Sequence, residues 1–211
     1  MRFIITAGPT REHIDPVRFL SNPSTGRMGF AVARAAAERG HEVTLVAGPV
    51  TLKTPKGVTR VDVTSAREML AAVEDALGDA QDGAGAPVTV ATAAVADWRP
   101  AQTAAKKLKK RDMTGVLRLV RNPDILKTVK CARKIGFAAE TGDALAEAAR
   151  KCREKGLAMV VANDVTEKGA GFGVSTNRVA FVKSDGSAER LPLMSKLAVA
   201  RRIVRFAETL A

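Results

Sequence analysis

The chain has 211 residues, of which 46% are hydrophobic and 27% charged, and its net charge is +12. This length and composition predict one globular domain, residues 1–211, built on one substantial core. No apolar run approaches the ~20 residues of a membrane-spanning helix, and the N-terminus has no signal-peptide pattern, so we expect a cytoplasmic protein without a membrane partner.

The first predicted element is a buried strand at the apolar run Phe3–Ile5, which ends before Gly8 and Pro9. A long loop rich in Pro, Asn, Ser and Gly follows and ends at Gly26, where helical periodicity begins. A strand, a loop of small residues and a helix N-terminus present backbone N–H groups and a positive dipole end, an arrangement that binds phosphate or another anion.

Strands and helices then alternate. We expect a second strand at 42–47, a third at 58–63 and a helix that starts at the capping box Ser65-Ala-Arg-Glu68. A polar, Gly-rich connector leads to a fourth strand, Val88–Ala94. Its residues are apolar on both faces, which is typical of a parallel strand covered by helices on each side.

The segment from Arg99 to Lys134 holds twelve Lys and Arg residues but only two acids, Asp112 and Asp124, so 12 − 2 = +10 of the net charge lies there. The concentration favours a pocket for several phosphates. A nucleic-acid surface more often spreads its charge over a face and interleaves aromatic residues, which make up only 4% of this chain. We expect this segment to fold back over the mouth near the N-terminus.

The second half repeats the same unit. Extended structure is expected at 116–120, and Asn122-Pro123-Asp124 has the pattern of a helix start, with Asn122 as the cap. Further elements follow: a strand at 135–139, a helix capped by Thr141, a strand at 159–162, a Gly-rich loop at 169–173, a hairpin at 178–191 that turns at Asp185-Gly186, and a basic amphipathic helix at 195–210.

This alternation predicts an α/β fold with a doubly wound, mostly parallel, Rossmann-like sheet, a C-terminal β-hairpin and a closing helix. Ligands should bind outside the carboxyl ends of the strands. Cys131 and Cys152 fall in predicted helices without metal-ligand spacing, so we expect buried free thiols and no zinc. A nicotinamide oxidoreductase is disfavoured, since no G-x-G-x-x-G follows the first strand and the chain has no Tyr.

Seven ordered motifs resemble the phosphopantothenate–cysteine ligase family. They are Thr6-Ala-Gly-Pro-Thr-Arg-Glu12, Ser21-Asn-Pro-Ser-Thr-Gly-Arg-Met-Gly-Phe30, Ala93-Ala-Val-Ala-Asp-Trp-Arg99, Lys107-Leu-Lys-Lys110, Asn122-Pro-Asp-Ile125, Gly136-Phe-Ala-Ala-Glu-Thr141 and Ala162-Asn-Asp-Val165. They span nearly the whole chain, and the ordered set is more specific than any one motif. In many bacteria this ligase follows a flavin-dependent decarboxylase in one protein. We expect no flavin in this chain, which is either a stand-alone ligase or one domain of such a protein.

The resemblance implies an amide ligase of coenzyme A biosynthesis. The carboxylate of 4′-phosphopantothenate is activated by CTP or ATP, with Mg²⁺, to an acyl-nucleotide, and L-cysteine then displaces the nucleoside monophosphate. It also implies a homodimer, with the hairpin at 178–191 or a neighbouring sheet edge as the contact, and a phosphopantothenoylcysteine decarboxylase as a further partner. The metal ligands and the choice between CTP and ATP stay open.

The resemblance also assigns site residues. Lys107 would neutralise the triphosphate from a mobile loop, and Asn22 would hydrogen-bond the activated acyl group. The nucleotide-binding residues would be Ala91, Thr92, Ala93, Asp97, Lys107, Asn122, Pro123, Asp124, Ile125, Phe137, Lys151 and Lys155. The phosphate- and substrate-binding residues would be Gly8, Ser24, Thr25, Gly26 and Gly29.

Each assignment has a structural alternative. Asn22 suits a turn, Asp97 a loop cap, Phe137 a core position and Gly29 tight helix packing, whereas Lys107 suits a solvated loop. The chain departs from the usual family residues at four positions: Phe19, Pro23, Arg27 and Trp98. The alternative is that the chain is a non-catalytic α/β protein that binds nucleotide or nucleic acid. The charge distribution argues against a nucleic-acid partner, so we expect none.

Overall fold

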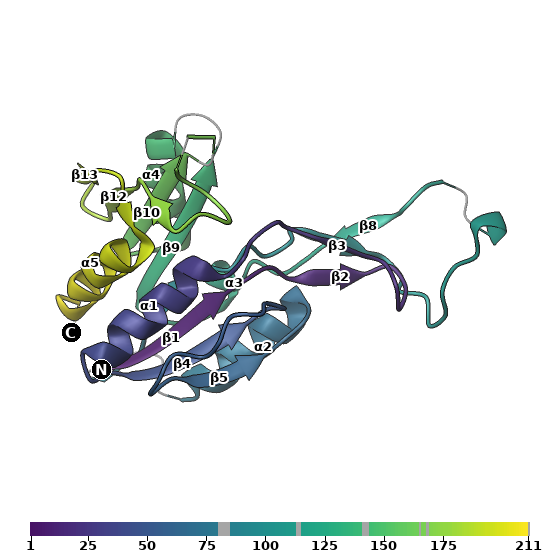
Figure 1. Cartoon of the computed structure of the whole chain (residues 1–211), viewed down its shortest axis with the longest axis horizontal. Helices are drawn as coiled ribbons and strands as arrows, with labels where there is room; N and C mark the ends of the chain where they lie inside the picture. The colour runs from purple at the N-terminus through teal and green to yellow at the C-terminus, as the bar shows by residue number, and fades with distance from the viewer. Residues whose placement is uncertain (80–84, 113–114, 141–143, 165, 168, 211) are drawn as a thin grey trace.

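The computed structural model describes residues 1–79, 85–112, 115–140, 144–164, 166–167 and 169–210. Its centre is an eight-stranded sheet in the order β13-β12-β10-β9-β6-β1-β4-β5 (Figure 1). The strands are β1 (Arg2–Ala7), β4 (Glu42–Ala47), β5 (Thr59–Asp62), β6 (Val88–Ala91), β9 (Arg133–Glu140), β10 (Met159–Asp164), β12 (Ala180–Lys183) and β13 (Ala188–Arg190). All neighbouring pairs from β10 to β5 are parallel, while β12 pairs antiparallel with both β10 and β13.

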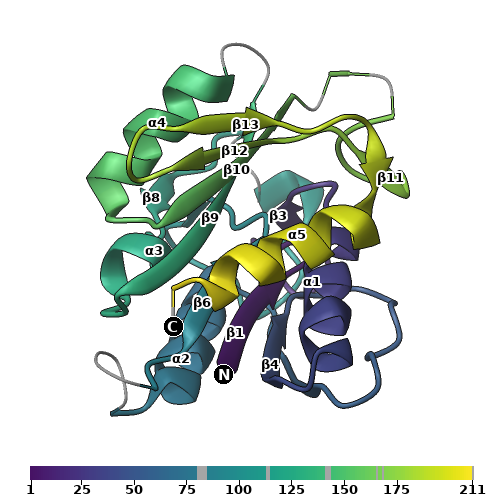
Figure 2. The ribbon, with the colours of Figure 1, turned by 90° about the vertical axis from the view of Figure 1, so that its left-hand side faces the viewer.

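Helices cover both faces of this sheet. The helices are α1 (Arg27–Glu38), α2 (Ala66–Leu77), α3 (Ile125–Thr128), α4 (Ala144–Lys155) and α5 (Lys196–Glu208). Phe3 and Ile5 of β1 share a core with α1 and α5, whereas Ile4 packs with Met69 of α2 and Ile125 of α3. α4 covers the same face as α2 and α3, over β9, β10 and β12 (Figure 2). The doubly wound sheet with its C-terminal hairpin and closing helix is therefore confirmed.

Local chemistry explains where the helices begin. Gly26, with a φ of 75°, precedes α1, and a left-handed residue at this point is easily supplied by glycine. Ser65 accepts a hydrogen bond from the Glu68 amide at 3.3 Å and so caps α2 as predicted. The Glu68 carboxylate accepts at 2.7 Å from the Thr64 amide, one residue before the cap, and not from the Ser65 amide as in a regular capping box. Ser195 caps α5 through the Ala198 amide. The predicted cap Thr141 lies outside the described residues.

An arm that the sequence did not predict extends away from the sheet. It consists of residues 10–21, 98–112 and 115–121, in two ribbons, β2 (Arg11–His13) with β3 (Phe19–Ser21) and β7 (Trp98–Pro100) with β8 (Leu119–Arg121). The two ribbons lie side by side, and a 3₁₀ turn, η1 (Lys110–Asp112), lies at the far end (Figure 1). The expectation of one irregular loop between Gly8 and Gly26 was therefore wrong.

Three boundaries also differ from the prediction. β6 ends at Ala91 rather than Ala94, because the chain then turns to bond with the loop after β1. The extended segment expected at 116–120 forms only the short strand β8. The cap of α3 is Asp124, whose carboxylate accepts from the Lys127 amide, and not Asn122. A small antiparallel pair, β11 (Thr176–Asn177) with β14 (Met194–Ser195), precedes α5.

The sheet order creates a crevice at β1 and β6. From β1 the chain proceeds outward to β4 and β5, and it then returns across the sheet to β6 on the other side of β1. Strand order reverses at this point, so the loops beyond the carboxyl ends of β1 and β6 diverge and leave room for a ligand. The elements that follow place their polar residues around this opening.

Candidate active site

A cavity of about 520 Å³ lies at this crevice. Its wall contains ten of the twelve residues assigned to nucleotide binding, from five separate stretches of the chain. They are Ala91, Ala93, Asp97, Asn122, Pro123, Asp124, Ile125, Phe137, Lys151 and Lys155. We call this the larger cavity. The sequence therefore identified most of its lining correctly, although binding of a nucleotide there stays a prediction.

The floor of the larger cavity is held by bonds between the loops after β1 and β6. The Thr92 hydroxyl donates to the Thr6 carbonyl at 2.6 Å, and the Ala93 amide donates to the Thr6 hydroxyl at 3.3 Å. The Ala94 amide donates to the Gly8 carbonyl at 2.9 Å. These bonds occupy the Thr6 hydroxyl, the Thr92 hydroxyl and the carbonyls of Thr6 and Gly8. The floor therefore presents mainly small side chains, against which a planar ring can lie.

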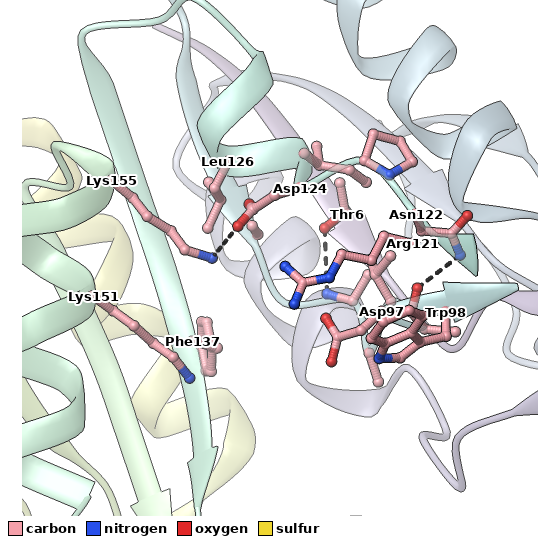
Figure 3. Close-up of a pocket in the computed structure, with 17 residues that line it drawn as sticks. Thr6, Asp97, Trp98, Arg121, Asn122, Asp124, Leu126, Phe137, Lys151 and Lys155 are labelled. Carbon is pink, nitrogen blue, oxygen red and sulfur yellow. Dashed lines mark hydrogen bonds and ion pairs between the residues drawn. The ribbon is translucent and has the colours of Figure 1, made fainter. Parts of the chain in front are cut away.

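Asn122 is a structural link between two loops. Its Nδ2 donates to the Ala96 carbonyl at 2.8 Å (Figure 3). Its backbone amide donates to the Asp97 carbonyl at 2.8 Å, and its Oδ1 accepts from Arg99 at 3.1 Å. The side-chain amide thus bonds through both its nitrogen and its oxygen, and one of its two N–H groups is used in these contacts. Asn122 therefore positions the loop that carries Asp97 on the cavity wall.

Cations approach the larger cavity from two sides. Lys151 and Lys155 project from α4, and Arg121 lies opposite them (Figure 3). The Lys155 ammonium is 2.8 Å from the Asp124 carboxylate. Lys151 is 3.5 Å from Glu147 on its own helix, and the Arg121 guanidinium stacks 5.2 Å from the centre of the Trp98 ring. Three cations against Asp97 and Asp124 leave the lining with an excess of positive charge.

A smaller cavity of about 110 Å³ adjoins the first. Four of the residues assigned to phosphate or substrate binding line it, together with Thr92: Ser24, Thr25, Gly26 and Gly29. Ala93, Ala94 and Phe137 line both cavities, so the two share a wall. A ligand in one cavity therefore meets a ligand in the other at these three residues.

Two of the predicted glycines serve packing as well. A Cβ on Gly29 would collide with the Thr92 hydroxyl and the Ala7 side chain, so its absence lets α1 lie close against β1. Gly8 lines neither cavity. It packs beneath Gly26, where a Cβ on Gly26 would come within 3.4 Å of its backbone. The alternative role of Gly29, tight packing of its helix, is thus supported. Gly8 packs against Gly26 in the loop before α1.

The two residues assigned to catalysis lie apart. Asn22 donates from Nδ2 to the Ala94 carbonyl at 2.9 Å, which places its amide beside the shared wall. Lys107 lines neither cavity; it is exposed on the arm, next to Leu108, whose backbone bonds to Asp15 and Arg18. The lysine-rich part of the basic segment, residues 106–111, extends outward with the arm and does not fold back over the mouth of its own chain (Figure 1), whereas Arg121 of the same segment lines the larger cavity.

Asp15 holds the arm together. Its buried carboxylate accepts from the Val17 amide at 2.8 Å, the Arg18 amide at 2.9 Å, the Leu108 amide at 3.2 Å and the Arg18 guanidinium. The guanidinium holds the pKa of Asp15 well below its usual range, and the backbone donors lower it further. Leu108, the residue after Lys107, is therefore tied to the loop between β2 and β3.

We expect Asp15→Asn to lower the melting temperature by a few degrees at pH 7, because the anionic acceptor is lost. A depressed native pKa stabilises the fold above the unfolded pKa of about 3.9, and this contribution is lost as the pH falls below that value. The difference between wild type and variant should therefore shrink below pH ~4 in thermal unfolding. Asp62→Asn, on an exposed carboxylate, is the matched control. A pH-independent difference would contradict this account.

Sequence reasoning missed several lining residues, of which Trp98, Arg121, Arg27 and Lys196 are charged or aromatic. Lys196 carried a detectable signal. It lies on the same face of α5 as the buried residues Val199, Ala200 and Ile203. A lysine at a buried position is rare unless it has a polar or charged partner. Arg121 and Trp98 gave no signal, because their approach depends on the unpredicted pairing of β7 with β8.

Three further features concern the thiols, the possible metal ligands and the helices of the described residues. Cys131 and Cys152 are buried free thiols, as predicted, and burial raises the pKa of Cys152. Cys152 lies in α4, but Cys131 follows the short helix α3 and is not helical, so the prediction of a helix at Cys131 was wrong. Within the described residues no cluster of three or more His, Cys, Asp or Glu side chains is arranged to hold a metal ion. In the same part of the chain, no helix combines the length and apolarity needed to cross a membrane.

Comparison with known proteins identifies relatives over nearly the whole chain. The chain is 44% identical over 214 residues to the coenzyme A biosynthesis bifunctional protein CoaBC of Vibrio vulnificus, and 46% identical over 207 residues to that of Bacillus subtilis. The matches cover 98% and 96% of this chain but 52% and 50% of the relatives. The chain therefore spans about half the length of the curated relatives it matches.

Two solved structures have the same fold. The C-terminal domain of a CoaBC is 42% identical, with a TM-score of 0.81 over 99% of this chain and 94% of that one. A Cab2 mutant in complex with phosphopantothenate-cysteine is 15% identical, with a TM-score of 0.76 over 99% of this chain and 86% of that one. The family model described as the DNA/pantothenate metabolism flavoprotein C-terminal domain matches residues 1–210. The chain belongs to this family.

Proposed function

We propose that the chain is a phosphopantothenate–cysteine ligase. It joins the carboxylate of 4′-phosphopantothenate to the amine of L-cysteine at the expense of CTP or ATP. The observation that carries the proposal is the pair of cavities with a common wall at Ala93, Ala94 and Phe137. A nucleotide in the larger cavity and an acid in the smaller one would meet there, as the first step requires. The relatives that are named coenzyme A biosynthesis proteins support it.

In the first step a carboxylate oxygen attacks the α-phosphorus, and pyrophosphate leaves. The residues assigned to nucleotide binding would contribute mainly position and positive charge. Lys151, Lys155 and Arg121 supply fixed cations, while Phe137 and the small side chains of the floor offer surfaces for the ring. Such a reaction between anions is accelerated by neutralisation and orientation more than by acid–base chemistry.

In the second step the cysteine amine attacks the acyl carbon, and the nucleoside monophosphate leaves. Asn22 would donate a hydrogen bond to the oxygen that gains charge. Neither histidine lines the larger or the smaller cavity: His41 bonds to Glu208, and His13 lies on the arm. The neutral fraction of the amine therefore serves as the nucleophile in this proposal, without a protein base.

Mg²⁺ would accompany the triphosphate. The described residues hold no three-ligand cluster, and Asp124 is already engaged by Lys155. This donor set suits an ion that keeps its waters and is carried by phosphate oxygens, as Mg²⁺ commonly does. When bound, the ion would neutralise the triphosphate and withdraw charge from the leaving pyrophosphate.

One assay tests the function. The protein is incubated with 4′-phosphopantothenate, L-cysteine, Mg²⁺ and either CTP or ATP, and the nucleotide product is identified. We expect CMP or AMP together with pyrophosphate. ADP or CDP would instead mean an acyl-phosphate route. The absence of turnover with both triphosphates would favour the non-catalytic alternative, and retention on DNA with steep salt dependence would favour a nucleic-acid partner.

We also propose a homodimer that forms through the arm. The arm carries several exposed large apolar residues: Val17, Phe19, Trp98, Val116, Leu117 and Leu119. Val116 is 81% exposed and Val17 57%. An exposed apolar surface of this kind usually meets a protein partner, and a second copy of the chain is the simplest one. The arm offers more exposed apolar surface than the hairpin at 178–191, the contact first expected.

We expect the double substitution Val17→Asp and Leu119→Asp to weaken self-association by about 100-fold, since burial of two new charges opposes contact. Molar mass from light scattering after size exclusion should fall from that of a dimer to that of a monomer, with an unchanged circular dichroism spectrum. Val61→Asp, at an exposed apolar position outside the arm, is the control. A monomeric wild type, or a variant that stays dimeric, would contradict the proposal.

The product of this reaction is a cysteine amide with a free carboxylate. A phosphopantothenoylcysteine decarboxylase would consume it, and such an enzyme is the further partner that we propose. No flavin is needed for the amide-forming steps.

A further inference from the structure

Thr10 belongs to the first of the seven motifs, yet it lines neither the larger nor the smaller cavity. It is the first residue of the arm and is completely buried. Its hydroxyl accepts a hydrogen bond from the Ala96 amide at 3.0 Å, and its own amide donates to the Ala94 carbonyl at 3.2 Å. One buried residue therefore holds the loop after β6 at two points.

The loop that Thr10 holds forms a wall of the larger cavity, which residues 93–98 line. Its other bonds come from two asparagines. The Asn22 side chain donates to the Ala94 carbonyl at 2.9 Å, and the Asn122 side chain donates to the Ala96 carbonyl at 2.8 Å. Among these three residues, Thr10 alone bonds to both alanines, so it fixes the spacing between the two points of the wall.

Thr10 is itself anchored to another part of the domain. The Arg11 amide donates to the Thr64 carbonyl at 2.8 Å. The buried carboxylate of Glu12 accepts from the Ala66 amide, at the start of α2, at 2.9 Å. A carboxylate is favourable there, because the helix dipole is positive at this end. The start of the arm is therefore fixed to α2, and the loop after β6 takes its position from Thr10.

Two backbone groups of this wall can still bind a ligand. Val95 and Asp97 line the larger cavity, and neither backbone amide has a hydrogen-bond partner among the described residues. Binding sites for small molecules use a few such placed donors to fix the orientation of the ligand. Because a shift of about 1 Å in such a donor is costly, the two amides are useful only while the loop is held in place.

We propose that Thr10 is a positioning residue for the nucleotide, which acts through the loop at 94–97 and does not touch the ligand. This inference rests on the proposed function, in which the nucleotide occupies the larger cavity. The Thr10 hydroxyl keeps the Val95 and Asp97 amides where the base or the sugar can accept from them, and it thereby lowers the KM for the nucleotide. Ala96, its partner, lines the larger cavity and not the smaller one, so the KM for 4′-phosphopantothenate should change little.

A purely structural role for Thr10 makes a different prediction. If the hydroxyl served only to satisfy the Ala96 amide, its loss would lower the melting temperature, and the folded variant would keep both KM values. Thr89 provides a matched control. It is also a completely buried threonine, its hydroxyl donates to the Cys131 sulfur at 3.6 Å, and it lines neither cavity.

The experiment compares wild type with Thr10→Val, Thr10→Ser and Thr89→Val in steady-state kinetics. Valine has nearly the shape of threonine but cannot accept a hydrogen bond, so the Ala96 amide loses its partner. We expect the KM for CTP or ATP to rise about 10- to 100-fold in Thr10→Val, with kcat nearly unchanged. Thr10→Ser retains the hydroxyl and should restore the KM. Thr89→Val should keep the wild-type KM even where its melting temperature falls.

The outcomes are distinct. A wild-type nucleotide KM in folded Thr10→Val overturns the inference, as does an equal rise in Thr89→Val or an equal rise in the KM for 4′-phosphopantothenate. If Thr10→Val does not fold, Thr10→Ala decides by the same measure. If the wild type shows no turnover, the proposed function fails, and calorimetric titration with CTP and with ATP still tests Thr10. Equal affinity of wild type and Thr10→Val, or no binding by the wild type, would then refute the inference.

Discussion

Lys107→Gln should slow pyrophosphate release by about 10²- to 10³-fold, the usual effect of removing one preorganised charge partner from a reaction that develops negative charge. Lys107 is exposed on the arm, so the fold and melting temperature should not change. The measurement is the rate of pyrophosphate formation with 4′-phosphopantothenate and saturating CTP or ATP, without cysteine. This condition isolates the first step.

Lys106→Gln is the matched control, since the neighbouring lysine is equally exposed and carries the same charge. If long-range attraction by the basic segment is all that matters, both variants should lose rate by the same small factor, and added salt should reduce the difference from wild type. A large effect confined to Lys107 indicates direct contact. Wild-type rates in Lys107→Gln would exclude the residue from the mechanism.

Contact requires Lys107 to reach a cavity that it does not line. Asp15 and Arg18 tie Leu108 to the other ribbon, so the whole arm must move or a second subunit must supply the arm. Mixing Lys107→Gln with Asn22→Ala separates the two cases. Activity recovered on mixing means that the arm of one subunit serves the cavity of the other, whereas no recovery means that each arm serves its own.

The sheet could be predicted because its signal is local. β4 was expected at 42–47 and begins and ends at those residues. The apolar run in β1 alternates between two cores, with Ile5 on the α1 face and Ile4 on the α2 face, as expected for a strand covered on both sides. Hydrophobic periodicity records such burial directly in the sequence.

The arm could not be predicted because its strands have only three residues each, and because one of its two pairs, β7 with β8, joins segments that are distant in sequence. β7 and β8 are separated by residues 101–118 of the basic segment, and β3 consists of Phe19, Leu20 and Ser21 after a proline-containing turn. Such short strands carry no period. The same limit affected Asn122, whose bonds to Ala96 and Arg99 depend on the β7–β8 pairing.

The candidate site was predicted where its residues follow strand ends, because parallel strands bring those ends together. Ala93 and Asp97, which follow β6, are examples, whereas Phe137 lies within β9. It was missed where a residue arrives from a distant element. Lys196 comes from the last helix, and Lys107, although assigned from its motif, lies on an arm whose direction the motif does not encode. Residue type suggests a role, whereas only the fold gives its position.

Asn22→Ala should reduce conversion of the acyl-nucleotide to amide by about 10²- to 10³-fold, as loss of an oxyanion donor commonly does. Asn22 itself lines neither cavity, but its amide spends one N–H on the carbonyl of Ala94, at 2.9 Å, and Ala94 lines both. Its second N–H therefore lies next to the shared wall. An uncharged donor suits this position, because it stabilises the developing oxyanion without binding the triphosphate as tightly as a cation would.

The expected signature is a burst. Pyrophosphate should form in an amount equal to the enzyme, while CMP or AMP should appear only slowly after cysteine is added; rapid quench and mass spectrometry measure both. Ser21→Ala is the control, since it removes a neighbouring bond to the Thr10 carbonyl without touching either cavity. If Asn22→Ala only displaced the Ala94 loop, pyrophosphate formation would fall as well, because that loop also lines the larger cavity. A variant that slows both steps equally would therefore assign Asn22 to positioning the wall, and wild-type amide formation would remove it from the reaction.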